Sequence, residues 1–99
     1  MIKLGYKVMR VENGYAIAGA DSSQSFKLDQ DELVYFAGNG IYLGTTKQYV
    51  LDYYSGLAEL EVLLTLSYNP KHINTGCLED KEPEISVTVA NLEHWEYIK

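Results

Sequence analysis

Few residues of this 99-residue chain could do chemistry, and their spacing matches no common catalytic or metal-binding motif. His72 and His94 have neither metal-ligand nor triad spacing, and Cys77 is the only cysteine, so the sequence predicts neither a zinc site nor an internal disulfide. The glycine-rich phosphate loop, the H-E-x-x-H helix and the G-x-S-x-G nucleophile turn are all absent from the sequence. We therefore predict no metal ion and no catalysis of these conventional kinds.

Carboxylates gather in one turn-rich segment, at Glu79, Asp80, Glu82 and Glu84. Such a run could chelate a cation, but Lys81 interrupts it and it lacks the D-x-D-x-D-G order of a calcium loop. The segment is therefore predicted to be a solvated turn.

Nine tyrosines and one tryptophan are many for so short a chain. Exposed aromatic side chains are rigid anchors where proteins recognise proteins, whereas in a small core a tyrosine buries its ring and keeps its hydroxyl in water. Tyr53 and Tyr54 are neighbours in a predicted helix and cannot both face inward. They are the best interface candidates among the aromatic residues.

Acidic residues outnumber basic ones by 14 to 8, which gives a net charge of −6. Because nucleic acids are held mainly by cationic contacts to phosphate, we predict no direct nucleic-acid binding and a partner with a basic surface. No apolar run approaches the ~20 residues of a membrane span, and the N-terminus has no secretion signal, so we expect no membrane contact and a cytoplasmic location. The length is that of a single domain, 1–99.

Short strands must position these residues. Alternating apolar residues predict strands at 2–10 and 15–18, which an Asn13-Gly14 turn joins into a hairpin. The segment 61–68 is nearly continuous in branched and aromatic residues, as expected of a central strand covered on both faces. The remaining strands are predicted at 26–28, 32–36, 41–43, 84–89 and about 92–98.

One convincing helix is predicted at about 46–55, with Thr45 or Thr46 as its N-cap and Gly56 as its stop. The residues expected to face the sheet are Tyr49, Val50 and Tyr53. Together these elements predict an α+β fold, in which a mixed or antiparallel sheet of six to eight short strands carries one main helix.

Two stretches carry a resemblance to a known family. Residues 38–54 begin Gly-Asn-Gly-Ile-Tyr-Leu and continue into the Thr-capped helix, and Glu-Val-Leu-Leu-Thr-Leu follows at 61–66. Residues 83–98 hold a glutamate-bearing strand and a strand that ends in Tyr97-Ile98. In this order the two stretches resemble the core of ADP-ribosyltransferases, particularly the poly-ADP-ribose polymerase branch. The same outline resembles short phage and prophage proteins that begin with Gly-Tyr-Lys-Val.

The resemblance implies roles for particular residues, with NAD as the cofactor of any active protein. Tyr42 falls at the tyrosine on which the nicotinamide ring stacks, with Gly40 in the same cofactor-binding stretch, and Glu84 at the glutamate that assists transfer. Such a carboxylate stabilises the oxocarbenium charge that develops when the nicotinamide–ribose bond breaks. Where family members carry a histidine or an arginine in the first strand, this chain offers Lys7 and Arg10, of which Arg10 is the candidate catalytic residue.

Because the first-strand histidine is missing, we expect a degenerate member without a cofactor that acts by binding another protein. Size, acidity and the phage resemblance predict an inhibitor of a basic host protein in the host cytoplasm, such as a CRISPR effector. Its expected interface residues are Tyr53, Tyr54, Glu79 and Glu82. Two alternatives stay open: a minimal NAD-dependent ADP-ribosyltransferase that uses Tyr42, Glu84 and Arg10, and an acidic mimic of nucleic acid.

Overall fold

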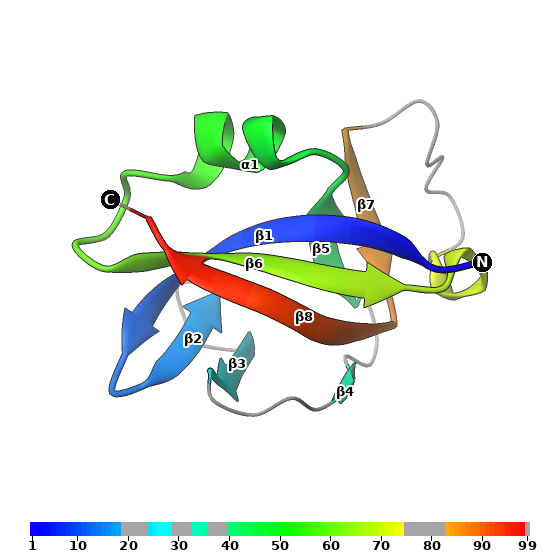
Figure 1. Ribbon diagram of the computed structural model, residues 1–99, viewed down its shortest axis with the longest axis horizontal. Helices are drawn as coiled ribbons and strands as arrows, with labels where there is room; N and C mark the ends of the chain where they lie inside the picture. Colours follow the sequence, from blue (N-terminus) through cyan, green and yellow to red (C-terminus); the bar gives the residue numbers. More distant parts are fainter. Residues whose placement is uncertain (19–23, 29–32, 36–39, 75–82, 99) are drawn as a thin grey trace.

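The computed structural model describes residues 1–18, 24–28, 33–35, 40–74 and 83–98. These residues form strands and one α-helix, together with a short 3-10 helix after the central strand (Figure 1). The elements are β1 (Lys3–Glu12), β2 (Tyr15–Ala18), β3 (Gln24–Lys27), β4 (Leu33–Tyr35), β5 (Ile41–Gly44), α1 (Lys47–Tyr54), β6 (Glu61–Tyr68), η1 (Pro70–His72), β7 (Glu84–Val87) and β8 (Val89–Tyr97). The predicted α+β class is confirmed.

Every strand pairing among the described residues is antiparallel. Six strands follow the order β3-β2-β1-β6-β8-β4, while β5 pairs with β1 and β7. The prediction of a central strand is confirmed, because β6 lies between β1 and β8 and most of its side chains are buried. In Figure 1, β1, β6 and β8 run side by side across the molecule, and β5 and β7 cross them at a steep angle.

The first hairpin forms as predicted. Asn13 and Gly14 both have positive φ, 53° and 81°, which is the backbone of a tight turn whose twist matches that of the flanking strands. Its strands pair Glu12 with Tyr15 and Arg10 with Ile17. The hairpin therefore extends β1 beyond the predicted end of the strand.

The last two strands divide at Thr88, so their predicted bounds of 84–89 and 92–98 are wrong. The Thr88 amide and hydroxyl both donate to the main-chain oxygen of His72, at 3.0 and 3.3 Å. This contact takes Thr88 out of the strand ladder, so that β7 ends at Val87 and β8 begins at Val89.

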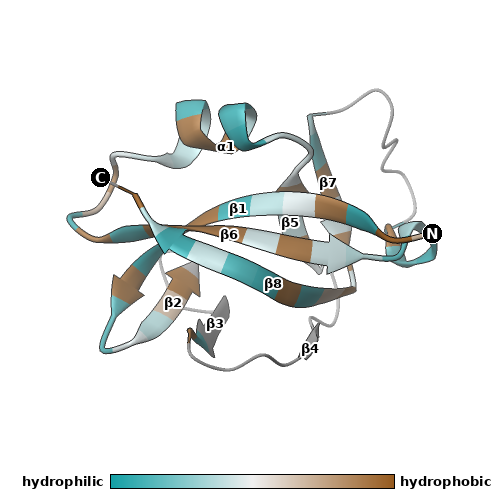
Figure 2. Ribbon diagram, in the orientation of Figure 1, coloured by the Kyte–Doolittle hydropathy of each residue, from teal (hydrophilic) through white to brown (hydrophobic). Residues whose placement is uncertain are grey.

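Hydrophobic and hydrophilic residues alternate along β1 and β8 (Figure 2), which puts one face of the sheet in contact with the core. Side chains from most of the strands meet in a single cluster. Its largest fully buried members are Met9, Ile41, Leu43, Leu64, Leu66 and Ile85, with smaller ones from β6 and β7.

Helix α1 begins and ends close to the predicted residues. The Thr46 hydroxyl caps it by accepting from the Tyr49 amide at 3.2 Å, and Gly56 follows it with φ of 85°. Val50 is buried as expected, but the prediction that Tyr53 faces the sheet is wrong, because 69% of Tyr53 is exposed. Tyr54, four residues after Val50 and therefore on the same side of the helix, is less exposed than Tyr53, at 38%.

A buried carboxylate fixes the turn that leaves α1. Glu61 accepts from the amide of Gly56 at 2.7 Å and from the amide of Leu57 at 3.2 Å. Two main-chain donors thus satisfy a charge that would be costly to bury alone. The end of α1 is tied to the first residue of β6, which sets where Tyr54 lies.

Candidate functional site

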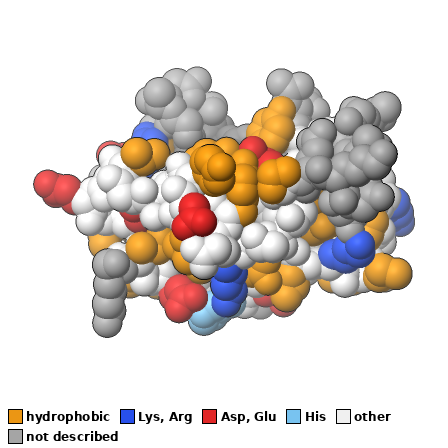
Figure 3. Space-filling model, turned by 90° about the horizontal axis from the view of Figure 1, so that it is seen from above, with side chains coloured by type: hydrophobic (Ala, Val, Ile, Leu, Met, Phe, Trp, Pro, Cys, Tyr) orange, Lys and Arg blue, Asp and Glu red, His pale blue; other side chains and the backbone are white. Residues whose placement is uncertain are grey.

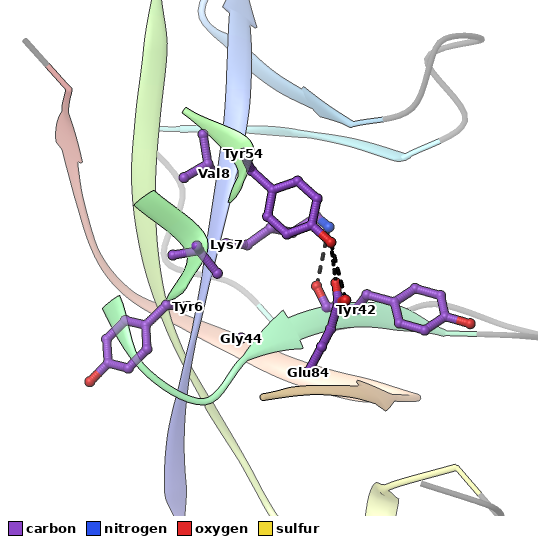
Figure 4. A pocket seen from close by; sticks show the side chains of 8 residues that line it. Tyr6, Lys7, Val8, Tyr42, Gly44, Tyr54 and Glu84 are labelled. Atoms are coloured by element: carbon purple, nitrogen blue, oxygen red, sulfur yellow. Dashed lines mark hydrogen bonds between the residues drawn. The ribbon is translucent and has the colours of Figure 1, made fainter. Parts of the chain in front are cut away.

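A pocket opens where β5 parts from β1. The two strands pair at one position, Tyr6 with Gly44, whereas β5 pairs with β7 along its whole length. Helix α1 lies over the gap, since it contacts both β1 and β5. The resulting pocket has a volume of about 240 Å³ (Figure 4). Its lining residues are Tyr6, Lys7, Val8, Tyr42, Gly44, Val50, Tyr54 and Glu84.

Lys7 reaches across this gap from β1 to β5. Its side chain is partly buried, and its Nζ donates to the main-chain oxygen of Tyr42 at 3.1 Å. Burial lowers the pKa of Lys7 below the ordinary value of 10.5, and the negative charge of Glu84 partly opposes the shift. The pocket therefore holds an amine that is more easily deprotonated than a lysine in water.

Glu84, the first residue of β7, is held by two phenols of α1. The Tyr54 hydroxyl donates to Oε1 at 2.9 Å and contacts Oε2 at 3.1 Å, and the Tyr49 hydroxyl lies 3.4 Å from Oε2 (Figure 4 shows the Tyr54 contacts). Burial, reinforced by the bond to Glu84, raises the pKa of Tyr54, so its hydroxyl remains a donor. This arrangement fixes the orientation of the Glu84 carboxylate in the pocket.

Tyr42 lies at the rim of the pocket. It alternates along β5 with the buried Ile41 and Leu43, and half of its surface is exposed. In Figure 4 its ring points away from Glu84, and the Tyr6 ring points outward on the other side. Lys47 Nζ lies 5.8 Å from the centre of the Tyr6 ring, a cation–π contact that braces this ring.

The two glycines of this region have different structural roles. Gly44 lines the pocket, and a Cβ there would lie 2.3 Å from Val50 Cγ1, so its absence lets α1 approach β5. Gly40, the predicted cofactor-binding glycine, is not among the lining residues. It has φ of 76°, and a Cβ on it would lie 2.3 Å from the Val87 main-chain oxygen. Gly40 thus permits close packing of the chain against β7.

Arg10, the predicted first-strand catalytic residue, is not part of this pocket. It lines a second hollow of about 340 Å³, which shares Lys7, Val8 and Tyr54 with the first. Its Nε lies 3.9 Å from Oε1 of Glu12. The cation of β1 that lines the same pocket as Tyr42 and Glu84 is therefore Lys7.

Of the four predicted interface residues, the structure describes Tyr53 and Tyr54. Tyr53 is exposed and packs its ring on that of Tyr49, with ring centres 4.8 Å apart. Tyr54 is also exposed, at 38%, and its hydroxyl donates to Glu84. Glu79 and Glu82 lie outside the described residues.

Sequence reasoning did not connect Tyr49 and Tyr54 with Glu84. The residues lie 35 and 30 positions apart in the chain, so no local pattern joins them. The available signal was the spacing of Tyr49, Val50 and Tyr54 along one helix, which indicates neighbouring side chains but not what they contact.

Comparison with family models, with curated protein sequences and with solved structures yields no match to this chain. In the part of the chain that the structure describes, no group of three or more His, Cys, Asp or Glu side chains could hold a metal ion. No helix among the described residues is long and apolar enough to cross a membrane.

Proposed function

We propose that the pocket between β1, β5 and β7 binds the nicotinamide–ribose end of NAD and that the protein is a minimal ADP-ribosyltransferase. One observation carries the proposal. The tyrosine and the glutamate that the family resemblance singles out line one open pocket, together with a cation of the first strand, Lys7. These residues come from three strands that the sequence separates widely and that pair as β1-β5-β7.

Each residue suits a part of that ligand. Tyr42 offers an exposed aromatic ring at the rim, on which the nicotinamide ring can stack after a rotation of the side chain. Lys7 offers a donor to the ribose oxygens in place of the missing histidine. Glu84 accepts from Tyr54 and Tyr49 and still has acceptor capacity for a ribose hydroxyl, because a carboxylate has about four acceptor sites.

The same arrangement supports the chemistry of transfer. The bond between the nicotinamide nitrogen and ribose C1′ breaks, and its electron pair leaves with nicotinamide. The oxocarbenium ion that forms is stabilised by Glu84, whose position the tyrosines of α1 fix in advance. An acceptor nucleophile then bonds to C1′ and releases a proton.

Calorimetry with NAD and an assay of released nicotinamide test the proposal. We expect a dissociation constant of about 10–100 µM. Tyr42→Ala should weaken binding about tenfold, and Glu84→Gln should slow nicotinamide release about a hundredfold, the usual cost of losing an electrostatic group of this kind. Tyr53→Ala and Glu96→Gln are matched controls, because both residues are exposed and neither lines the pocket. Absence of binding at millimolar NAD would contradict the proposal, as would equal binding by all four variants.

A second candidate is the acidic protein-binding inhibitor that the sequence favours. It is supported by exposed apolar side chains on and after α1, Tyr53 and Leu57, which are 69% and 79% exposed. The exposed acids Asp52 and Glu59 lie in the same segment. Seen from above α1, hydrophobic side chains gather beside acidic ones (Figure 3). Such a surface fits a basic partner with an apolar centre.

The kinetics of a captured host protein test this second candidate. Its association should slow markedly between about 50 and about 300 mM salt, because screening weakens electrostatic steering. Tyr53→Ala should mainly speed its dissociation. An association rate that does not respond to salt would contradict this candidate.

A further inference from the structure

The structure distinguishes one lysine from the others. Lys3, Lys27, Lys47 and Lys71 are exposed, whereas Lys7 alone among the described lysines is partly buried, and it lines both hollows beside β1. An exposed amine is almost fully protonated at neutral pH and therefore a weak nucleophile. Lys7 lies in an open pocket that a small molecule can enter.

We propose that the pocket is also a carbonyl-binding site, in which Lys7 Nζ condenses with small aromatic aldehydes to form an imine. The site requires an accessible amine, a neighbouring group that moves protons, and room for the carbonyl compound. The pocket supplies each of these. This inference does not rest on NAD binding.

The surroundings of Lys7 hold its amine at the pocket and make its neutral form easier to reach than that of an exposed lysine. Its Nζ has the Tyr42 main-chain oxygen as an acceptor, which fixes the nitrogen at the pocket and also accepts from a neutral amine. Burial lowers the pKa of Lys7, and Glu84 limits that shift. The ionisable side chains that share the two hollows with it are Tyr6, Tyr42, Tyr54, Glu84, Arg10 and Glu61.

The neighbouring groups suit the proton transfers of condensation. The lone pair of Nζ attacks the carbonyl carbon, and the carbonyl oxygen takes up a proton to give a carbinolamine. Nitrogen then loses its remaining transferable proton while the hydroxyl leaves as water, so that amine and aldehyde give imine and water. Glu84 lines the same pocket, and its charge acts on Lys7, so through one water it can accept a proton from nitrogen and return one to oxygen, with the Tyr54 hydroxyl bonded to it as a further donor.

The shape of the pocket selects the substrate class. A volume of about 240 Å³ holds one ring with its substituents, and Tyr54 and, after a rotation of its side chain, Tyr42 can contact that ring. An aromatic aldehyde therefore fits better than a long aliphatic one, whose chain would extend into solvent. Pyridine-3-carbaldehyde is a suitable probe because it is a single flat ring that carries its carbonyl at the edge.

Reductive trapping tests the inference. The folded protein is mixed with pyridine-3-carbaldehyde and cyanoborohydride at pH 7, and the modified amines are located by peptide mass spectrometry, which also separates the amino terminus. We expect Lys7 to be modified severalfold faster than Lys47 and Lys71, because the pocket holds the aldehyde beside its amine and the lowered pKa leaves more of that amine neutral. In guanidinium chloride, where the pocket is lost, the rates should become equal. Modification of Lys7 no faster than that of Lys71 in the folded protein would overturn the inference.

Two variants separate reactivity from mere accessibility. Lys7→Arg keeps the charge and a donor to Tyr42, so it should stay folded by circular dichroism and lose the rapid modification at position 7. Glu84→Gln removes the carboxylate that raises the pKa of Lys7, so the midpoint of the pH–rate profile should move to lower pH. The plateau rate of this variant should fall severalfold, because the proton carrier is gone. An unchanged profile in Glu84→Gln would contradict the role of Glu84 in this site.

Discussion

The two neighbours of β1 in the middle of the sheet make very different contacts with it. With β6 it forms an unbroken ladder from Lys3 opposite Tyr68 to Arg10 opposite Glu61. With β5 it pairs at Tyr6 and Gly44 only. Main-chain pairing joins β1 to β6 along the whole ladder. Between β1 and β5, the Lys7 side chain donates to a main-chain oxygen of β5. The ladder contributes rigidity, and the incomplete junction contributes space in which polar side chains from three strands meet.

The largest effect on stability should come from the unbroken ladder between β1 and β6. Leu64 of β6 is fully buried in the core cluster, so Leu64→Ala leaves a cavity and should lower the free energy of unfolding by about 3–5 kcal/mol. Because β6 pairs with both β1 and β8, the loss should be global. Denaturant unfolding followed by circular dichroism measures it. A loss below about 1 kcal/mol would show that the ladder is not the main source of stability.

A smaller and local effect is expected where β5 parts from β1. Gly44→Ala places a Cβ against Val50 Cγ1, so α1 must move away from β5, at a cost of about 1–3 kcal/mol. The double variant Gly44→Ala, Val50→Ala removes the clashing carbon. Its stability should therefore exceed the value expected from adding the two single losses. Simple additivity in this cycle would mean that the glycine does not set the approach of the helix.

The smallest effect concerns a single hydroxyl of the pocket. Tyr54→Phe loses the bond to Glu84 and should cost less than about 1.5 kcal/mol at pH 7, the usual net value of one hydrogen bond. Above about pH 10 an unfolded tyrosine loses its proton, whereas folded Tyr54, whose pKa is raised, keeps it. Folding then binds a proton, so the stability of the natural protein falls as pH rises.

The phenylalanine variant lacks this ionisable group, and the stability difference between the two proteins should therefore shrink between pH 10 and pH 11. Denaturant titrations across this range measure the difference. The exposed Tyr53→Phe is the matched control for the loss of a tyrosine hydroxyl from the same helix.

The sequence predicts those features whose causes lie close together in the chain. The Asn13-Gly14 turn, the Thr46 cap and the apolar run of β6 each have a local signal, and each is confirmed. The prediction for Tyr53 is wrong because a helix of two turns buries only one or two side chains, too few for the sequence to show which side of the helix faces the sheet.

The pocket was harder to predict because it depends on how distant strands diverge. Tyr42 and Glu84 were identified through a resemblance, but choosing between Lys7 and Arg10 requires knowing where β5 leaves β1. The bonds from Tyr49 and Tyr54 to Glu84 depend on the placement of α1 over β1 and β5, which no periodicity encodes.

The ladder between β1 and β6 also constrains how the chain can reach this structure. A hairpin such as β1 with β2 forms in about 1–10 µs, since its two strands adjoin in the sequence. The partner of β1 on the other side begins only at Glu61, and closing so long a loop is slow, as for other folds rich in distant pairings. During synthesis the first hairpin must therefore wait, with one edge uncovered, until β6 has emerged from the ribosome. The pocket assembles later still, because Glu84 belongs to a strand made after β6.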